Sequence, residues 1–286
     1  MIRLENVKKS YENFELDCTM EVKKGQVTGL IGRKGSGKST VFRATLNLIN
    51  ITDGEIQVFP EGGYADSENK KKDIGVFIND SGFCMYFTVK KIASVMDSMY
   101  EKFNRQIFLD RCIAAGLPLN RKIEKFSTGM KTKLKIIIAT SYNAKLLLLD
   151  EPATGPDVVA REEIINMLRE FIMDGEKSIL ISSHIAEDIE SICDDIYMID
   201  SGRIILHEYT HVILDEYGIL KLTEEQFRKT DKEYLFKVKR ESYGYICLTR
   251  EKKFYMENYK DIVIENCSLD MLIKLMSGGE ENERSA

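Results

Sequence analysis

One segment constrains the fold of this chain more than any other. Residues 32–40 read G-R-K-G-S-G-K-S-T, and the apolar run Val27–Ile31 precedes them directly. A strand, a glycine-rich turn and a following helix aim backbone N–H groups and the positive end of a helix at one point, which suits a polyphosphate. The segment therefore predicts an α/β sheet with a phosphate-binding loop at the end of one buried strand.

Each residue type in this loop suits phosphate binding. The glycines permit positive φ angles and a close approach of the backbone. Lys38 can reach the β and γ phosphates, and the Ser39 hydroxyl can ligate Mg²⁺. A tight turn that merely contains a lysine is the simpler alternative, and the flanking strand and helix disfavour it. The predicted nucleotide-contacting residues of the loop are Gly32, Arg33, Lys34, Gly35, Ser36, Gly37, Lys38, Ser39 and Thr40.

Length and composition narrow the class of protein. The 286 residues suffice for one large domain, or for one domain with a smaller appendage. A net charge of −5 gives no global basis for nucleic-acid binding. The six cysteines include no C-x-x-C pair, which indicates reduced thiols and a cytoplasmic protein. No signal peptide and no apolar run of about 18 residues is present, so we expect membrane contact only through a partner.

A second segment carries the chemistry. Residues 146–151 read L-L-L-L-D-E, and only a fully buried strand readily explains four consecutive leucines. This strand delivers Asp150 and Glu151 at its carboxyl end, where open α/β sheets bind their ligands. Asp150 is predicted to hold Mg²⁺, and Glu151 to orient or deprotonate the attacking water. Alone, this Asp-Glu pair before Pro152 would indicate only a solvated turn.

With these segments the chain resembles the ATP-binding subunit of an ABC transporter, over about residues 1–206. Three further segments match motifs of that family in their usual order. They are F-S-T-G-M at 126–130 for the signature, A-T-G-P-D at 153–157 for the D-loop and S-S-H at 182–184 for the switch. The resemblance implies an ATPase that binds ATP and Mg²⁺ and dimerises around two ATP molecules.

The same resemblance implies roles for single residues. Tyr11 stands where the family has an aromatic ring that stacks on adenine. Ser127 and Gly129 match the signature positions that cap the γ phosphate bound by the other subunit of the dimer. Asp157 matches the acid of the D-loop, and His184 the switch histidine that contacts the γ phosphate. Together with Lys38 and Glu151, His184 completes the predicted catalytic group.

The chain departs from the family pattern at several positions. Asn79 stands where the family has a glutamine, or a glutamate in export-type relatives, that reaches the metal. Because Asn is one methylene shorter, we expect it to contact Mg²⁺ only through water, which affects coupling more than hydrolysis. The other departures are Arg33 and Lys34 in the phosphate loop, Thr128 and Met130 in the signature, and Pro156 in the D-loop.

The predicted fold class is a P-loop α/β nucleotide-binding domain of the ABC type. Residues 1–207 form this domain, with an antiparallel β portion and a helical subdomain at about 80–142. Apolar residues at helical spacing predict a helical insertion over 89–117, and composition predicts a loop over 60–69. Residues 208–286 form a small C-terminal α+β region with a disordered tail from 278.

Two functions are compatible with these features. The first is a cytoplasmic ATPase, peripheral on the cell membrane, that drives a separately encoded integral membrane subunit. Met130-Lys131 and the segment 215–218 resemble bacterial exporters of peptides or antibiotics. The alternative is a low-turnover ABC-type regulatory ATPase that acts on a soluble partner, as Asn79 suggests. Cargo, direction of transport and the choice between a homodimer and a heterodimer stay open.

An apolar segment before the helical insertion has two interpretations. Phe83, Met85, Tyr86 and Phe87 lie where the family receives a helix of its membrane partner. They are equally compatible with a docking surface and with the protein core.

Overall fold

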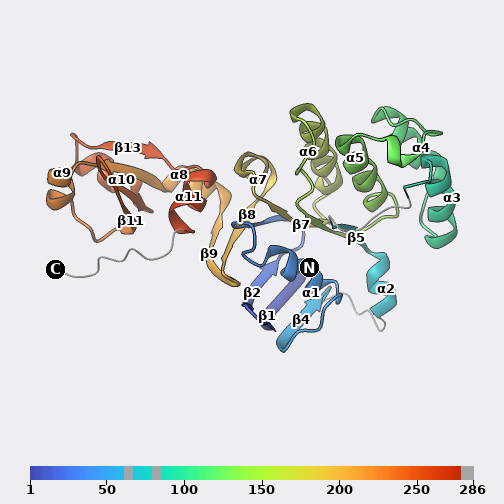
Figure 1. Ribbon diagram of the computed structural model, residues 1–286, viewed down its shortest axis with the longest axis horizontal. Coiled ribbons are helices and arrows are strands. Elements are labelled where there is room, and N and C mark those ends of the chain that lie inside the picture. The colour runs from blue at the N-terminus through green and yellow to red at the C-terminus, as the bar shows by residue number, and fades with distance from the viewer. Residues whose placement is uncertain (61–66, 79–84, 278–286) are drawn as a thin grey trace.

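The computed structural model describes residues 1–60, 67–78 and 85–277, and its strands form two sheets (Figure 1). The large sheet has the order β4-β1-β2-β9-β8-β3-β7-β6-β5, and the small one β11-β12-β10-β13. The strands of the large sheet are β1 (Ile2–Tyr11), β2 (Phe14–Val22), β3 (Val27–Ile31), β4 (Asp53–Val58), β5 (Ile74–Phe77), β6 (Leu146–Asp150), β7 (Ser178–Ser183), β8 (Asp195–Asp200) and β9 (Arg203–Tyr209).

Five neighbouring strands, β8, β3, β7, β6 and β5, run parallel, whereas β9 returns antiparallel to β8 and β1 pairs antiparallel with β2 and β4. The parallel strands are covered on both faces, which explains their continuous apolar runs. Leu147 and Leu149 enter one core, and Leu146 and Leu148 enter the other. The four-leucine segment is therefore a central buried strand, as its sequence predicts.

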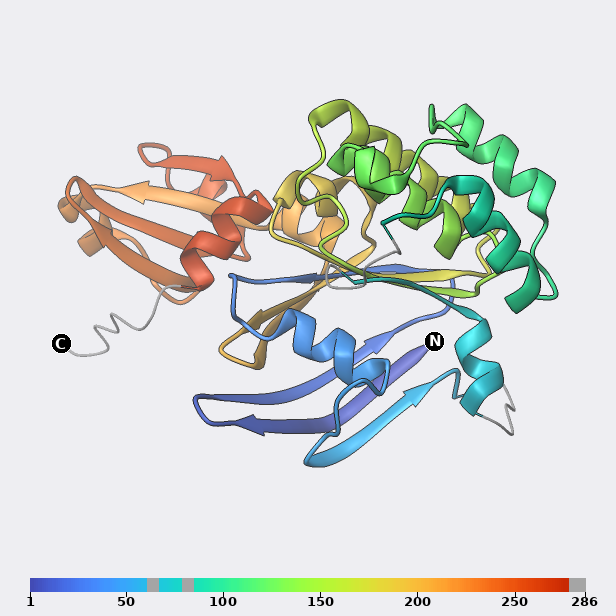
Figure 2. The same ribbon diagram turned by 45° about the vertical axis from the view of Figure 1, so that its right-hand side comes forward.

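Helices cover the two faces of the parallel strands unequally. Figure 2 shows helix α1 (Lys38–Thr45) between these strands and the antiparallel strands, where Val41 and Phe42 are fully buried. The other face carries the helices that follow β5 in the sequence of the large domain. They are α3 (Val89–Met99), α4 (Arg105–Ala114), α5 (Thr128–Ala139), α6 (Val158–Ile172) and α7 (Ala186–Ile192), with the short 3-10 helix Ile123–Lys125 before α5 and with α1 (Lys38–Thr45) on the opposite face.

The helical insertion is two helices. Thr88 caps α3 by accepting from the N–H of Lys91, and Asn104 caps α4 by accepting from the N–H of Ile107. The Asn104 cap begins a second helix inside the predicted insertion, and the spacing of the apolar residues alone does not indicate this break. The predicted loop over 60–69 was wrong at its end, because helix α2 (Ser67–Lys72) begins inside it.

A C-terminal unit follows, which we define as residues 210–277. It holds α8 (Thr210–Glu216), β10 (Gly218–Leu222), α9 (Glu224–Lys229), β11 (Leu235–Glu241), β12 (Gly244–Thr249), α10 (Lys252–Asn258), β13 (Val263–Asn266) and α11 (Leu269–Met276). Tyr255 of α10 packs on one face of the small sheet, and Leu272 of α11 belongs to the large core on the other. The predicted domain boundary after 207 stays a prediction, and the predicted disordered tail lies outside the described residues.

None of the helices in the three described ranges combines the length and apolarity needed to cross a bilayer.

Candidate nucleotide-binding site

The phosphate loop rests on the turn between β8 and β9. Gly32 has a φ of 155°, and a Cβ there would lie 2.2 Å from the carbonyl oxygen of Ile199. Gly37 has a φ of 114°, and a Cβ there would lie 2.8 Å from the ring of Phe14. The N–H of Gly202 donates to the carbonyl of Ser36 at 2.8 Å. Glycine is required at both positions because backbone and ring approach so closely.

The loop presents hydrogen-bond donors that have no side-chain partner among the described residues. Gly37, the residue before α1, has no side chain to cap the helix, which leaves its first N–H groups available to an anion. Ser36 is 5% exposed, and among the described residues its Oγ has no hydrogen-bond partner. Ser39 and Thr40 follow at the more exposed start of α1, and Arg33 and Lys34 are exposed. These features fit a bound polyphosphate.

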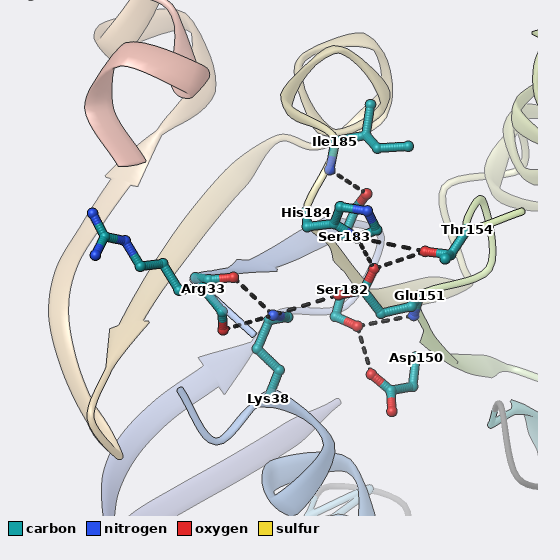
Figure 3. A network of polar contacts seen from close by, with 10 residues as sticks. Arg33, Lys38, Asp150, Glu151, Thr154, Ser182, Ser183, His184 and Ile185 are labelled. Atoms are coloured by element: carbon teal, nitrogen blue, oxygen red, sulfur yellow. Dashed lines mark hydrogen bonds and ion pairs between the residues drawn. The ribbon is translucent and has the colours of Figure 1, made fainter. Parts of the chain in front are cut away.

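Lys38 is held inside the loop. Its Nζ donates to the carbonyl oxygens of Gly32 at 2.7 Å and Arg33 at 3.2 Å, and lies 3.4 Å from Oε1 of Glu151 (Figure 3). The Lys38 side chain is only 6% exposed. In Figure 3 the guanidinium of Arg33 points away from this ammonium group. A buried ammonium group held in this way is a preorganised positive charge at the phosphate loop.

Glu151 stands at the carboxyl end of β6 in a left-handed conformation, with a φ of 56°. Its N–H donates to Oγ of Ser182 at 3.0 Å. Its Oε2 accepts from Nδ1 of His184 and from Oγ1 of Thr154, the latter at 2.9 Å. Such backbone strain in a non-glycine residue persists only where its surroundings enforce it. The segments at the ends of β6 and β7 thus fix this carboxylate opposite Lys38.

The surroundings of Glu151 favour its charged form. Partial burial alone raises the pKa of its carboxyl, but the hydrogen bond from His184 and the charge of Lys38 outweigh that effect. The net pKa lies below the ordinary value of 4.5. Glu151 is therefore a carboxylate at neutral pH, as an acceptor for a water proton must be.

This lowered pKa predicts a pH-dependent contribution to stability. A depressed folded-state pKa contributes stability that is complete above 4.5 and is lost as the pH falls through the folded value. We expect the difference in unfolding free energy between wild type and Glu151→Gln to shrink as the pH falls below 4.5. Urea denaturation of both proteins at pH 7 and at pH values below 4.5 measures this difference. A difference that is constant with pH would contradict the assigned environment.

Two residues act in this network in ways that the sequence motifs did not indicate. Ser182 donates through Oγ to Oδ1 of Asp150 at 2.7 Å while accepting from the N–H of Glu151. Thr154 donates to Glu151 and lies 3.5 Å from Nδ1 of His184. Both stand inside matched motifs, but only their neighbours received roles. A hydroxyl residue inside a motif that meets a catalytic or metal-binding carboxylate could have indicated these roles from the sequence.

The predicted metal ligands are only partly described. Asp150 is 3% exposed, and Ser182 contacts only one of its two carboxylate oxygens. Across the described ranges no three His, Cys, Asp or Glu side chains gather as a metal site. This donor set fits Mg²⁺, which takes one or two carboxylates and completes its shell with phosphates and water. Asn79 lies outside the described residues.

Tyr11 ends β1 beside the loop. It pairs with Phe14 across the β1–β2 turn, with ring centroids 6.2 Å apart, and the ring of Phe14 occupies the space that a Cβ at Gly37 would need. Its ring is 48% exposed, and Nζ of Lys9 lies 5.3 Å from its centroid. An exposed ring at this place is available for stacking on a base.

Ser127 of the signature and Asp157 of the D-loop serve as helix N-caps. Ser127 caps α5 by accepting from the N–H of Met130, and Asp157 caps α6 by accepting from the N–H of Ala160. A Cβ on Gly129 would lie 2.8 Å from the Cβ of Ala160, so the two helix starts are packed together. Among the described residues, no hydrogen bond or ion pair joins Ser127 or Asp157 to Lys38 or Glu151.

Comparison with known proteins decides the family. The family model described as ABC transporter matches residues 16–154. The ATP-binding protein NatA of Bacillus subtilis is 30% identical over 229 residues, which cover 77% of this chain and 87% of NatA. The lantibiotic transport ATP-binding protein SrtF of Streptococcus pyogenes is 32% identical over 211 residues, or 73% of this chain and 90% of SrtF. This chain belongs to the ABC transporter ATP-binding family.

Solved structures agree on the fold of this ABC ATPase. The ATP-binding cassette MJ0796, in a dimeric post-hydrolysis state bound to ADP and phosphate, superimposes with a TM-score of 0.64. That alignment covers 73% of this chain and 99% of the cassette at 22% identity. The ABC family assignment makes this chain an ATP-binding domain that hydrolyses ATP, and its P-loop α/β fold agrees with the prediction.

Proposed function

We propose that this ABC ATPase binds ATP across the phosphate loop, with its triphosphate at the start of α1. The network that joins Lys38, Glu151 and His184 carries this proposal. Lys38 supplies a buried cation, and the N–H groups of the loop and the free Oγ of Ser36 supply hydrogen bonds. Arg33 and Lys34 add positive charge at the rim of the loop, where it favours the bound anion.

Ser39 and Asp150 would hold Mg²⁺. Bound there, the ion would neutralise charge on the phosphates during transfer. Ser182 fixes Asp150 by donating to one carboxylate oxygen, which leaves the other for the metal shell. Asn79 is proposed to contact that shell through a bound water.

Glu151 and His184 would direct hydrolysis. The Glu151 carboxylate accepts a proton from the attacking water and orients it, because its low pKa keeps it ionised. His184 is 53% exposed in its side chain and holds Glu151 through Nδ1, so its other ring nitrogen can face the γ phosphate. Thr154 keeps the two side chains together.

The working unit is proposed to be a dimer. Ser127 and Gly129 of one subunit, at the start of α5, would cap the ATP held by the other, with Asp157 beside them. Among the described residues no hydrogen bond or ion pair joins Ser127 or Asp157 to Lys38, which supports a contribution across the interface. Val158 and Val159 at the start of α6 are 73% and 68% exposed, as residues covered only in a dimer would be. A homodimer and a heterodimer are both compatible with this arrangement.

The dimer would drive a membrane subunit. Tyr86, before α3, is 72% exposed and Met85 is 38% exposed, whereas Phe87 packs against the core. Phe83 lies outside the described residues. Exposed Tyr86 and Met85 are proposed to receive that partner on the cytoplasmic face of the cell membrane. The names of SrtF and of the bacitracin transport ATP-binding protein BcrA support transport of peptides or antibiotics, and we propose export as its direction.

Stacking on Tyr11 is expected to contribute to nucleotide affinity. Tyr11→Ala should weaken ATP binding about tenfold, because stacking on a base contributes about 1–3 kcal/mol. Tyr11→Phe keeps the ring and should bind as wild type does. Calorimetric titration with ATP measures both variants. Equal affinity in all three proteins would place adenine elsewhere.

Turnover measured with and without the membrane partner tests the proposal. Release of phosphate from ATP should rise when the purified chain is combined with the integral membrane subunit that co-purifies with it. Slow turnover that no membrane protein stimulates would contradict the transport function. That result would favour the low-turnover regulatory ATPase acting on a soluble partner.

A further inference from the structure

The C-terminal unit is attached to the helix that follows the switch histidine. Helix α11 lies against α7, on the side of the small sheet nearest the large domain (Figure 1). Oε1 of Glu190 in α7 accepts from the N–H of Leu269, the first residue of α11, at 2.7 Å. That N–H has no acceptor within its own helix. A carboxylate at this place is also stabilised by the positive end of α11.

Apolar packing reinforces this bond. Leu269 and Leu272 of α11 are fully buried and belong to the same core cluster as Ile189 of α7 and Cys193 behind it. Ser268 caps α11 at this contact with α7, because its Oγ accepts from the N–H of Met271. Glu190 and Leu269 are 79 positions apart in the sequence, so the contact ties two distant parts of the chain together.

Helix α7 also touches the catalytic region. It begins two residues after His184, and Oγ of Ser183 accepts from the N–H of Ile185 in the short connection. Asp188, 5% exposed, faces Nε of Arg161 in α6 at 3.8 Å. Because the seven residues of α7 span only about 10 Å, one short helix connects Glu190 to the switch segment.

We propose that the C-terminal unit controls ATP turnover by fixing α7, and that Glu190 is the positioning residue of this clamp. The proposal rests on the proposed role of His184 in hydrolysis. Glu190 touches neither the phosphate loop nor Glu151; it acts on His184 through α7. Release of the clamp therefore slows the chemical step and leaves ATP binding at Lys38 unaffected.

A substitution at Glu190 in the full chain tests this clamp. In Glu190→Ala, kcat should fall about tenfold while KM for ATP stays unchanged, because small misplacement of a catalytic group is costly. Glu190→Gln keeps an acceptor oxygen without the charge and should give an intermediate kcat. Glu187→Ala is the matched control, since Glu187 is an exposed acid of the same helix. It should behave as wild type.

Hydrogen exchange supplies a readout that does not depend on activity. Peptides covering residues 183–192 should exchange faster in Glu190→Ala than in wild type or Glu187→Ala. In a His184→Ala background, Glu190→Ala should cause no further loss of turnover. Wild-type kcat in Glu190→Ala, or a lower kcat with unchanged exchange in α7, would overturn the clamp. A wild-type protein without ATPase activity would instead contradict the proposed function. In that case hydrogen exchange still tests whether Glu190 fixes α7 to α11.

Discussion

Glu151→Gln is expected to stop ATP hydrolysis and to leave ATP binding intact. Removal of a positioned general base costs about a hundredfold or more in rate. The amide keeps the size of the side chain and still accepts from Thr154, whereas it removes a negative charge 3.4 Å from Nζ of Lys38. ATP should therefore persist in the site and the dimer should accumulate. Phosphate release measures the first effect, and light scattering with ATP measures the second.

A matched control separates this effect from a general loss of charge. Glu162→Gln makes the same chemical change at an exposed position of α6 and should keep wild-type turnover and wild-type mass in solution. Unchanged turnover in Glu151→Gln would remove Glu151 from the mechanism. Loss of ATP binding in the same variant would mean that its carboxylate organises the phosphate loop.

Lys38→Ala is expected to weaken ATP binding about thirtyfold or more. A hydrogen bond to a charged group contributes about 1.5–3 kcal/mol, and Lys38 is a buried cation aligned by two carbonyl groups. The substitution also leaves the Gly32 and Arg33 carbonyls without this donor, so the loop itself loses order. Calorimetric titration with ATP measures the change.

The control for Lys38 is an exposed lysine elsewhere. Lys71→Ala in α2 removes one positive charge from the surface and should bind ATP as wild type does. Melting temperatures of both variants show whether the fold is kept. Wild-type affinity in a folded Lys38→Ala protein would contradict the position of the triphosphate at this loop.

The strands that carry the site were predictable because buried parallel strands consist of continuous runs of apolar residues. The four leucines of β6 and the apolar run of β3 require central, fully covered strands. One strand of the small sheet was not visible in the sequence. This strand, β10, spans five residues between α8 and α9, and no motif marks it. Short strands and helices of this kind depend on tertiary packing more than on periodicity.

In the site, too, the contacts of single residues that depend on tertiary packing could not be predicted from the sequence. The motifs identified Glu151 and His184, but the hydrogen bonds of Thr154 and Ser182 depend on how the segments at the ends of β6 and β7 meet. Ser127 and Asp157 are also helix N-caps, a local role that short polar residues before apolar helices commonly have. Sequence matching alone emphasised their nucleotide role. The contact of Glu190 with α11 carried no sequence signal at all.

A detergent pull-down of tagged Glu151→Gln protein with ATP tests the central claim most directly. Lys38→Ala under the same conditions is the matched control, since it should not hold the nucleotide. The account predicts that an integral membrane protein with several apolar helices co-purifies with Glu151→Gln in the presence of ATP and is identified by its mass. Recovery of soluble proteins only, or of no partner, would contradict a transporter subunit.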